Sequence, residues 1–498
     1  MTHEPMSRSS SSFFRRDAAG NEERAALTTP PPLPAEDDMG GAPAGRRRWP
    51  SSVMRMKGVG SVMVGVVFLA LLILVHRWVG LDASFLRDSS MVRTSTRQWH
   101  PHHNISTPPL MTLPPFSCGN GTAAPATCPA TPPSPPPTSK PATGGEPAAS
   151  CPDYFRYIHD DLRPWRGAGI TREAVERGRR HAYFRLVVVS GRAYVETYRR
   201  SYQTRDAFTQ DATTLDVVFP DWSFWGWPEV NIGAWPATLE AVRRESARVR
   251  WPEREPFAFW KGNPGVARIR GELMKCNPAS DGKDWNARLF SQDWNHAIHN
   301  GFKDSSIPKQ CLHRYKIYIE GEAWSVSEKY IMACDSPVLF VNTPYQDILS
   351  RGLVAGEHYW PINRTRMCES IRAAVDWGNA HPAAARRIGE QGSRFVREQM
   401  AMDYVYDYMF HLITEYAKLL RYKPTVPANA VEICAESMAC AAAAGREREC
   451  MDESVEGFVA GFDPCSLPPP FTEEEKREIA AKEEEVLRKV AKLEEENM

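Results

Sequence analysis

This sequence lacks the features by which several common classes of protein are recognised. Its 11 cysteines include no CxxC pair, so a zinc ribbon and a thioredoxin-like redox site both lack support. Its 61 basic side chains are matched by 61 acidic ones, so net charge gives no reason to expect a nucleic-acid partner. Long apolar runs are also absent, with one exception.

That exception, Gly58–Val75, predicts a membrane anchor. The run carries no charge and is long enough to span a bilayer. Arginine and lysine gather before it, between residues 46 and 57, which predicts a cytosolic N-terminal side. It lies far from Met1 and no small-residue cleavage site follows, so a cleaved signal peptide is disfavoured. We expect a type II signal anchor over residues 58–76, with the remainder luminal. The chain has no KDEL-type ending, so we favour the Golgi membrane, with the endoplasmic reticulum as the alternative.

Composition divides the remaining chain into five segments. Residues 1–57 are rich in Ser, Pro and Arg and predict a disordered cytosolic tail. Residues 77–150 are rich in Pro, Ser and Thr and predict a luminal stem. The globular part then divides into an N-terminal lobe over 151–250 and a C-terminal lobe with closing helices over 251–440. Residues 441–498 form a tail that contains a charged helix.

The luminal assignment has consequences for asparagine and cysteine side chains. N-glycosylation sequons begin at Asn104, Asn120 and Asn363, all on the predicted luminal side. The lumen is oxidising, so we expect disulfide bonds, with Cys151 at the edge of the globular part as a participant.

Several elements of the globular part are predicted by local pattern. Phe184–Val189 and Ala193–Tyr198 predict a hairpin-like pair of strands. Asp376–Met400 and Tyr404–Leu420 predict long amphipathic helices. From Thr472 a charged sequence opens with a capping box and carries a thin apolar stripe. This favours a solvated single helix over a weak coiled coil.

The stretch His313–Val341 predicts a strand, a turn, a helix and a second strand. Tyr315–Ile319 is β-branched and aromatic, and Gly321 breaks the strand that this composition favours. Val338–Val341 predicts the second, buried strand. The stretch therefore predicts a βαβ unit, around which we expect the globular part to be organised.

The start of its helix suggests an anion site. Ser325 or Ser327 supplies an N-cap, and Glu328 has the capping-box spacing from Ser325. Lys329 would lie in the first turn, where the helix dipole is already positive. A cation among free N–H groups suits an anion such as a diphosphate. The alternative is an ordinary βαβ unit with a solvated lysine, and the residues alone leave both open.

A second unit of the same kind precedes it. Phe257–Trp260 predicts a strand, Lys261–Pro264 a turn, and the following helix carries Arg268 and Arg270. Cations near the helix start make this a second possible anion site. Solvated arginines on an exposed face are an equally good explanation.

The segment Thr214–Trp235 is dense in aromatic residues separated by Pro and Gly. This composition predicts a structured, concave loop. Tryptophan-rich sites often stack sugars or bases, although most large aromatic side chains belong to the core.

Several long blocks occur in one order: FPDWSFWGWPEVNI (Phe219–Ile232), FWKGNP (Phe259–Pro264), DWNARLFSQDW (Asp284–Trp294), CLHRYKIYIEGEAWSVSEKYIMACDS (Cys311–Ser336), HYWPI (His358–Ile362) and MDYVYDYMFHLITEYAKLL (Met402–Leu420). Together they resemble the Rumi-like protein O-glucosyltransferases, the capsule-associated transferase domain of glycosyltransferase family 90. The chain is most similar to the plant, single-pass members. The resemblance covers residues 151–440.

The resemblance implies an α/β fold of GT-B type, with two Rossmann-like lobes facing a cleft. It implies a UDP-sugar held mainly by the C-terminal lobe, with no metal ion and no cofactor beyond this donor substrate. By position, it implies that one side of the nucleotide-sugar site is lined by Gly262, Asn263 and Arg270. The other side would be lined by Gly321, Trp324, Ser325, Ser327 and Lys329. Members outside plants tend to place an arginine where this chain has Ser327.

One departure from the family concerns the catalytic base. The family has several dozen residues after the block that corresponds to Gln203–Asp206, including a strand and the presumed catalytic aspartate. This chain continues almost directly into the aromatic segment. An inverting transferase needs a carboxylate to take the acceptor's proton. Asp211, Asp216 and Asp221 lie nearby, but no motif assigns the role, so the catalytic residue is unknown.

The sequence therefore predicts a luminal, membrane-anchored O-glycosyltransferase. It would move glucose or xylose from a UDP-sugar to a hydroxyl of a protein or polysaccharide. An alternative is a catalytically inactive UDP-sugar-binding or scaffold protein. A third reading is that the gap is a gene-model error and that the native chain is longer.

Overall fold

The structure is a computed structural model that describes residue 128 and residues 150–198, 216–280, 282–442, 445–457 and 464–496. The predicted cytosolic tail, the anchor over 58–76, nearly all of the stem and the gap after Asp206 lie outside these residues. Asn104 and Asn120 lie outside them as well. Among the described residues, no helix is both long and apolar enough to cross a membrane.

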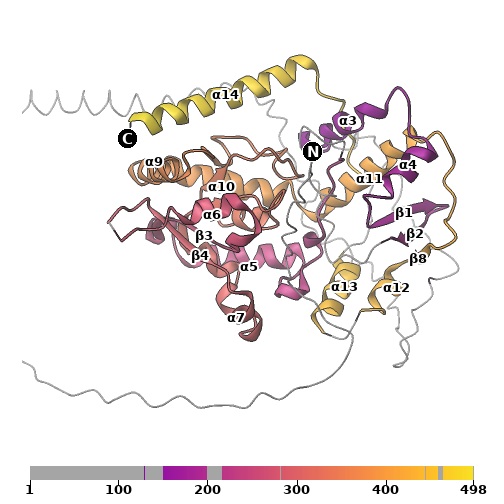
Figure 1. Cartoon of the computed structure of the whole chain (residues 1–498), viewed down its shortest axis with the longest axis horizontal. Helices are drawn as coiled ribbons and strands as arrows, with labels where there is room; N and C mark the ends of the chain where they lie inside the picture. Colours follow the sequence, from indigo (N-terminus) through magenta and orange to yellow (C-terminus); the bar gives the residue numbers. More distant parts are fainter. Residues whose placement is uncertain are drawn as a thin grey trace, which may run out of the picture. The chain divides into compact units, whose positions relative to one another are not determined.

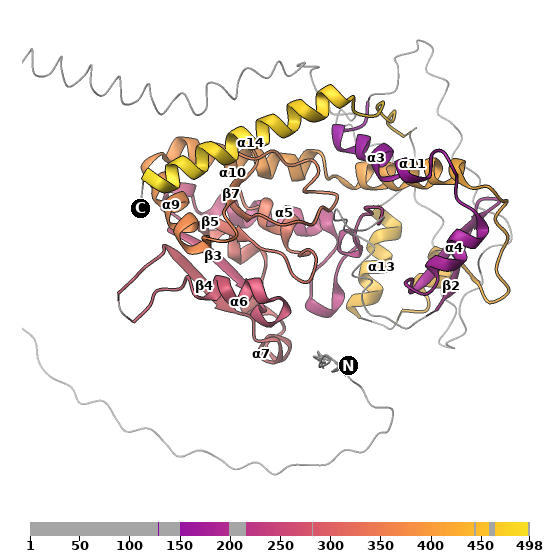
Figure 2. The same cartoon turned by 45° about the horizontal axis from the view of Figure 1, so that its top comes forward.

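A five-stranded parallel sheet forms the centre of the region that carries the site (Figures 1 and 2). In spatial order it contains β4 (Ala287–Ser291), β3 (Glu255–Gly262), β5 (His313–Tyr318), β6 (Val338–Val341) and β7 (Trp360–Ile362). The last four residues of β5 and all of β6 are buried, as parallel strands covered on both faces should be. The two strands predicted around residues 315–319 and 338–341 are therefore confirmed.

Helices α6 (Arg268–Met274), α7 (Trp294–His299) and α8 (Glu328–Met332) connect strands of this sheet. Helix α5 (Trp235–Arg248) precedes the sheet in the chain, and α9 (Met367–Ala380), α10 (Pro382–Glu398) and α11 (Met402–Leu419) follow it. The prediction of one helix over Asp376–Met400 is wrong, because α9 ends at Ala380 and α10 starts at Pro382. Proline has no N–H for the helix ladder and suits the first helical position.

A second, smaller sheet is antiparallel. It contains β1 (Phe184–Val189), β2 (Arg192–Thr197) and β8 (Val431–Ile433), in that order. The predicted hairpin is confirmed. Its two-residue turn, Ser190-Gly191, has φ of 52° and 76°, the left-handed backbone that suits such hairpins. The described residues thus hold one parallel, Rossmann-like sheet, and the second Rossmann-like lobe stays a prediction.

The remaining α-helices of the described residues are α3 (Tyr157–Asp161), α4 (Arg172–Gly178), α12 (Ala435–Ala439), α13 (Arg446–Gly457) and α14 (Glu473–Glu496). Helix α14 begins with the predicted capping box, in which Thr472 N donates to Glu475 Oε2 and Glu475 N to Thr472 Oγ1. Helix α14 was expected to be fully solvated, but one of its faces is buried. Helix α14 packs along α9 (Figures 1 and 2), with Val490 and Glu494 buried. Glu494 accepts a hydrogen bond from Ser370.

Disulfide bonds join segments that are far apart in sequence. Between described cysteines the pairs are Cys128–Cys434, Cys151–Cys465, Cys276–Cys368 and Cys311–Cys334. The predicted participation of Cys151 is confirmed. An ion pair adds to this linkage, because both guanidinium Nη atoms of Arg351 donate to Asp161, at 2.6 and 2.7 Å, with both side chains only 2% exposed.

We predict that Gly389→Ala destabilises the fold, whereas Gly271→Ala does not. A Cβ on Gly389 of α10 would lie 2.6 Å from the carbonyl carbon of Ser336, which lies just before β6. Helix α10 would therefore have to move away from the start of that strand. Overpacking of this kind costs about 1–3 kcal/mol. Gly271 in α6 has nothing within 4 Å of its Cβ position, so alanine should stabilise by about 0.5–1 kcal/mol. Denaturant unfolding of both variants measures the difference, and equal stability would contradict the close packing of α10.

Candidate functional site

The site lies where the parallel sheet changes its direction of winding. The connection after β3 runs through α6 to β4 on one side, and the connection after β5 runs through α8 to β6 on the other. The carboxyl ends of the adjacent strands β3 and β5 therefore border a crevice, which is where open α/β sheets bind ligands. A cavity of about 750 Å³ opens there.

Most of the site residues expected from the sequence line this cavity. They are Gly262, Asn263, Arg270, Gly321, Trp324, Ser325 and Ser327. They come from two segments, one that runs from the end of β3 into α6 and one between β5 and α8. The fold therefore brings together the two strand–turn–helix units that the sequence marked as possible anion sites.

Two glycines keep the loop backbones close to the cavity. A Cβ on Gly262 would lie 2.6 Å from the Trp260 ring. A Cβ on Gly321 would lie 2.8 Å from the carbonyl oxygen of Trp324, to which Gly321 N donates. A side chain at either position would clash within its own segment and displace the backbone or ring beside the cavity, which is the physical reason for glycine there.

Arg270 joins the two loops. Its Nε donates to the carbonyl of Glu320 at 2.8 Å and its Nη2 to Ser325 Oγ at 3.1 Å. Its Nη1 lies 3.4 Å from the carbonyl of Asn263. Burial lowers the pKa of this guanidinium from its usual value. Arg270 thus places one positive charge on the cavity wall, held in position by neutral oxygens instead of a carboxylate.

The start of α8 differs from the prediction. Ser327 is the N-cap but its side chain makes no capping hydrogen bond, and Ser325 Oγ instead contacts Ser327 Oγ at 2.8 Å. The predicted capping box between Ser325 and Glu328 is therefore wrong. Glu328 is 1% exposed, and burial beside Asp347 raises the pKa of its carboxyl well above the usual range. Both serine hydroxyls are left beside the cavity.

Lys329 does not line the cavity. Its side chain is 1% exposed, and its Nζ lies 3.4 Å from Asp221 Oδ2, also in contact with Ser223 Oγ. The ammonium also lies 4.7 Å from the centre of the Phe224 ring. The structure thus corrects the expected contact with a diphosphate, because this lysine fastens the aromatic loop to α8 instead. The sequence correctly predicted that Lys329 lies in the first turn of a helix, but it did not predict that Asp221 is its partner.

The same pairing bears on the candidate catalytic bases. Asp221 is 4% exposed, and its carboxylate accepts a hydrogen bond from Ser223 N at 2.8 Å. It is therefore buried and already bonded, away from any acceptor substrate. Asp216 is exposed and not on the cavity wall, and Asp211 lies outside the described residues. Among the described residues that line the cavity, only Glu322 has a carboxylate.

A buried lysine on the cavity wall was missed by the sequence reasoning. Lys316, in the middle of β5, is 2% exposed, and its Nζ donates to the carbonyl of Gln310 at 2.9 Å. It also lies 4.2 Å from the centre of the Phe259 ring. Burial lowers the pKa of this ammonium to about 7. The signal in the sequence was a lysine within an otherwise apolar strand, YKIYI.

The aromatic segment forms another wall of the cavity. It contains the short 3-10 helices η5 (Trp222–Phe224) and η6 (Pro228–Val230), as expected of a structured loop. The Trp222 ring makes T-shaped contacts with the rings of Trp227 and Trp324, with ring centroids 5.8 Å and 5.9 Å apart. Trp222 therefore links the aromatic loop to the loop after β5.

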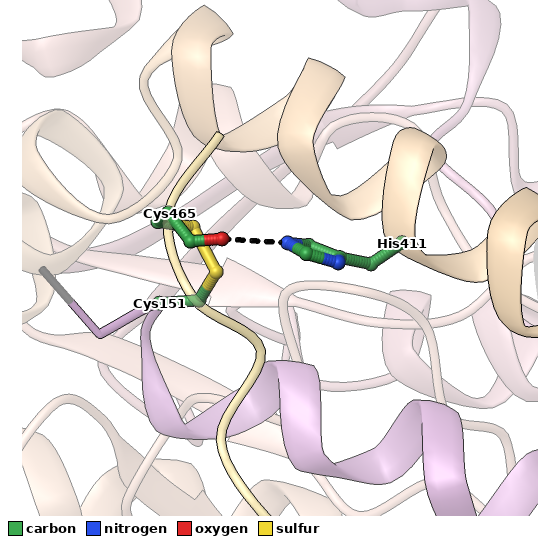
Figure 3. Close-up of side chains that lie close together, drawn as sticks. All are labelled: Cys151, His411 and Cys465. Atoms are coloured by element: carbon green, nitrogen blue, oxygen red, sulfur yellow. Dashed lines mark hydrogen bonds between the residues drawn. A yellow bond between two sulfur atoms is a disulfide. The ribbon is translucent and has the colours of Figure 1, made fainter. Parts of the chain in front are cut away.

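A cluster of possible metal ligands, Cys151, His411 and Cys465, lies elsewhere (Figure 3). The two sulfur atoms are bonded to each other, so neither is a thiolate that binds a metal. His411 Nε2 lies 2.7 Å from the carbonyl oxygen of Cys465. This cluster therefore joins segments of the fold through a disulfide and a hydrogen bond and is not a metal site.

We predict that Lys329→Ala destabilises the protein by about 3–5 kcal/mol, because it leaves the Asp221 carboxylate buried without its cation. Denaturant unfolding measures this. The double variant Lys329→Met with Asp221→Leu should recover part of the loss, since it removes both charges. Lys303→Ala is the matched control, because Lys303 is an exposed lysine on the cavity wall. A Lys329→Ala variant as stable as the control would contradict the structural role.

Comparison with known proteins supports one family. A family model described as glycosyl transferase family 90 matches residues 146–213 and 208–494. The two matched ranges overlap at residues 208–213, just after Asp206, where the sequence suggests a gap relative to the family. An "O-glucosyltransferase rumi homolog" from Anopheles gambiae is 21% identical over 57% of this chain and 83% of its own length.

Two further relatives carry similar names. "Protein O-glucosyltransferase 1" from Homo sapiens is 24% identical over 44% of this chain and 58% of its own length, so the match spans little more than half of that relative. "O-glucosyltransferase rumi" from Drosophila melanogaster is 21% identical over 57% of this chain and 81% of its own length. The chain belongs to glycosyl transferase family 90, a family of glycosyltransferases.

Proposed function

We propose that this chain is a luminal, membrane-anchored O-glycosyltransferase that moves glucose or xylose from a UDP-sugar to a hydroxyl group. The observation that carries the proposal is the cavity at the carboxyl ends of β3 and β5. Gly262, Gly321 and Arg270 lie on its wall. Family membership and the printed names of the relatives support sugar transfer.

The cavity provides groups suited to a leaving diphosphate. Arg270 supplies a fixed positive charge, and the hydrogen-bonded pair of hydroxyls of Ser325 and Ser327 keeps one O–H to donate beside it. Lys316 adds a further, buried cation to the wall below about pH 7. Groups that are already oriented stabilise charge that develops in a transition state without reorganising. These residues would hold the donor without a metal ion or other cofactor.

In the proposed reaction, the acceptor oxygen bonds to the anomeric carbon of the sugar. The bond from that carbon to the phosphate oxygen breaks, and UDP leaves with the electron pair. The hydroxyl proton must pass to a base. Glu322 is the carboxylate that the described cavity wall offers for this role. If the native chain is longer at the gap after Asp206, the family's aspartate-containing segment would be the alternative source.

A luminal location is supported by the disulfide bonds. Four pairs are formed among the described cysteines, and disulfides persist in oxidising compartments such as the secretory pathway. We propose the Golgi membrane, with the endoplasmic reticulum as the alternative.

A second candidate function is that of an inactive UDP-sugar-binding protein. It is favoured by one observation: Asp221 is paired in the core and Asp216 lies off the cavity wall. The two proposals agree on nucleotide binding and differ on transfer.

We predict that the full chain in detergent binds UDP, and that Gly321→Ala weakens this binding at least about ten-fold, or about 1.4 kcal/mol. The added methyl would meet the Trp324 carbonyl at 2.8 Å and displace the loop that Arg270 holds. Titration calorimetry measures the affinity. Binding should be tighter at pH 6 than at pH 8, because Lys316 is charged only below about pH 7.

Gly271→Ala is the control, since nothing lies within 4 Å of that Cβ position. Release of UDP from UDP-glucose or UDP-xylose would then separate the two proposals. Binding with release supports the transferase, and binding without release supports the inactive protein. Absence of UDP binding would contradict both.

We predict that an N-glycosidase increases the gel mobility of the protein from secretory membranes. Asn363 begins an exposed sequon turn, in which its Oδ1 accepts from Thr365 N at 2.9 Å and Thr365 Oγ1 at 2.8 Å. Asn363→Gln should remove one glycan step. Asn295→Gln, an exposed asparagine outside any sequon, should change nothing. A mobility that the enzyme leaves unchanged would argue against the luminal orientation.

A further inference from the structure

The small antiparallel sheet has one face that is both apolar and exposed. Residues that lie opposite each other in antiparallel strands share a face of the sheet. The register therefore places one set of side chains together, called the apolar face below: Phe184, Leu186, Val188, Ala193, Val195, Thr197, Val431 and Ile433. Four of them are between 44% and 67% exposed: Phe184, Leu186, Val188 and Val431. Contiguous exposed apolar side chains mark a contact surface.

The opposite face of the same sheet carries charges that already have partners. Arg185 donates to both carboxylate oxygens of Glu176 in α4, at 2.9 and 3.2 Å, and also pairs with Glu196. Arg192 of β2 pairs with Glu432 of β8. An antiparallel sheet usually turns its apolar face inward and its polar face to solvent. The apolar face therefore predicts a cover that the described residues do not supply.

The predicted stem is covalently attached at this sheet. Cys128 forms its disulfide with Cys434, which directly follows Ile433, the last residue of β8. Cys434 is also the N-cap of α12, and Cys440 is the C-cap of the same helix. The stem therefore meets the globular part at the edge of the apolar face.

A second attachment follows from the cysteines that form disulfides. Cys440 is disulfide-bonded, and the other disulfide-bonded cysteines of the described residues pair among themselves. The partner of Cys440 therefore lies outside the described residues. The sequence has one cysteine there, Cys118, ten residues before Cys128 in the stem.

The stem sequence just before Cys118 has an apolar repeat. Leu110, Leu113 and Phe116 recur at every third residue, and Pro108-Pro109 and Pro114-Pro115 accompany them. Proline-rich sequence favours the polyproline II helix, which has three residues per turn. The three apolar side chains would share one side of that helix over about 19 Å, close to the length of the six-residue strand β1, about 20 Å.

This segment suits the apolar face better than residues 199–215, which follow β2. That stretch, RRSYQTRDAFTQDATTL, is rich in charged and hydroxyl side chains and has no apolar repeat. The prolines of the stem segment have no N–H for a strand ladder, so it would lie across the face of the sheet instead of extending its edge.

We propose that residues 110–118 of the stem lie across the apolar face as an extended strap, held by the disulfides Cys118–Cys440 and Cys128–Cys434. Leu110, Leu113 and Phe116 then pack on the exposed side chains of β1 and β8. Part of the predicted stem is thus a component of the fold, and only the residues before the strap act as a spacer to the predicted anchor. This inference does not depend on sugar transfer.

The test uses the full chain purified in detergent from secretory membranes. The photoreactive residue p-benzoylphenylalanine replaces Leu186, and mass spectrometry maps the products of irradiation. Leu186 should cross-link to residues 110–118 of the same chain. The same residue at Ile298, an apolar side chain of α7 that is 42% exposed, should not cross-link to the stem. Cross-links from Leu186 to residues 199–215, to a second copy or to detergent alone would overturn the proposal.

Two further measurements separate the apolar contact from the covalent one. The double variant Leu113→Ser with Phe116→Ser should lose most of the Leu186 cross-link, because it removes the apolar side chains that pack on the face. The matched control, Met91→Ser with Val92→Ser in the same stem, should keep it. Digestion of the unaltered chain without reduction should yield a peptide pair that joins Cys118 to Cys440. A different partner for Cys440, or equal cross-linking in both double variants, would contradict the strap.

Discussion

The buried ion pair between Lys329 and Asp221 fixes how the site is assembled. The two residues are separated by 108 positions, and both are almost completely buried. A buried charge without a partner is strongly destabilising, so the aromatic loop must cross α8 where these two side chains meet. That crossing places Trp222 against Trp324 and so joins two walls of the cavity.

Arg270 applies the same constraint at the opposite side of the cavity. It binds the loops after β3 and β5 through carbonyl and hydroxyl oxygens and leaves its charge uncompensated by any of these partners. The contrast with Lys329 is informative. One cation is neutralised in the core and serves packing, while the other is held by neutral groups on a cavity wall and is suited to an anion. The aromatic segment, which Trp222 joins to the loop after β5, completes the cavity.

Much of the fold was predictable from local pattern. The strands around 315–319 and 338–341, the hairpin near residue 190 and the capping box at Thr472 were all recognised, because each depends on neighbouring residues. The division between α9 and α10 at Pro382 was missed although its cause is local, whereas the other failures came where contacts outside the local pattern decide. Helix α14 was expected to be solvated, but Glu494 near its end is buried against Ser370. The capping box at Ser325 was replaced by contacts to Ser327 and Arg270.

The sequence by itself determined the family, the two strand–turn–helix units and the glycines that bring their loops close to a ligand. These follow from short-range patterns and from blocks that occur in a specific order. Only the tertiary structure decided which cations face the cavity and which are paired inside. Lys329, which was expected at the cavity, pairs with Asp221 in the core, whereas Lys316, which the sequence reasoning missed, lies on the cavity wall. The partner of a charge depends on packing between segments far apart in the chain.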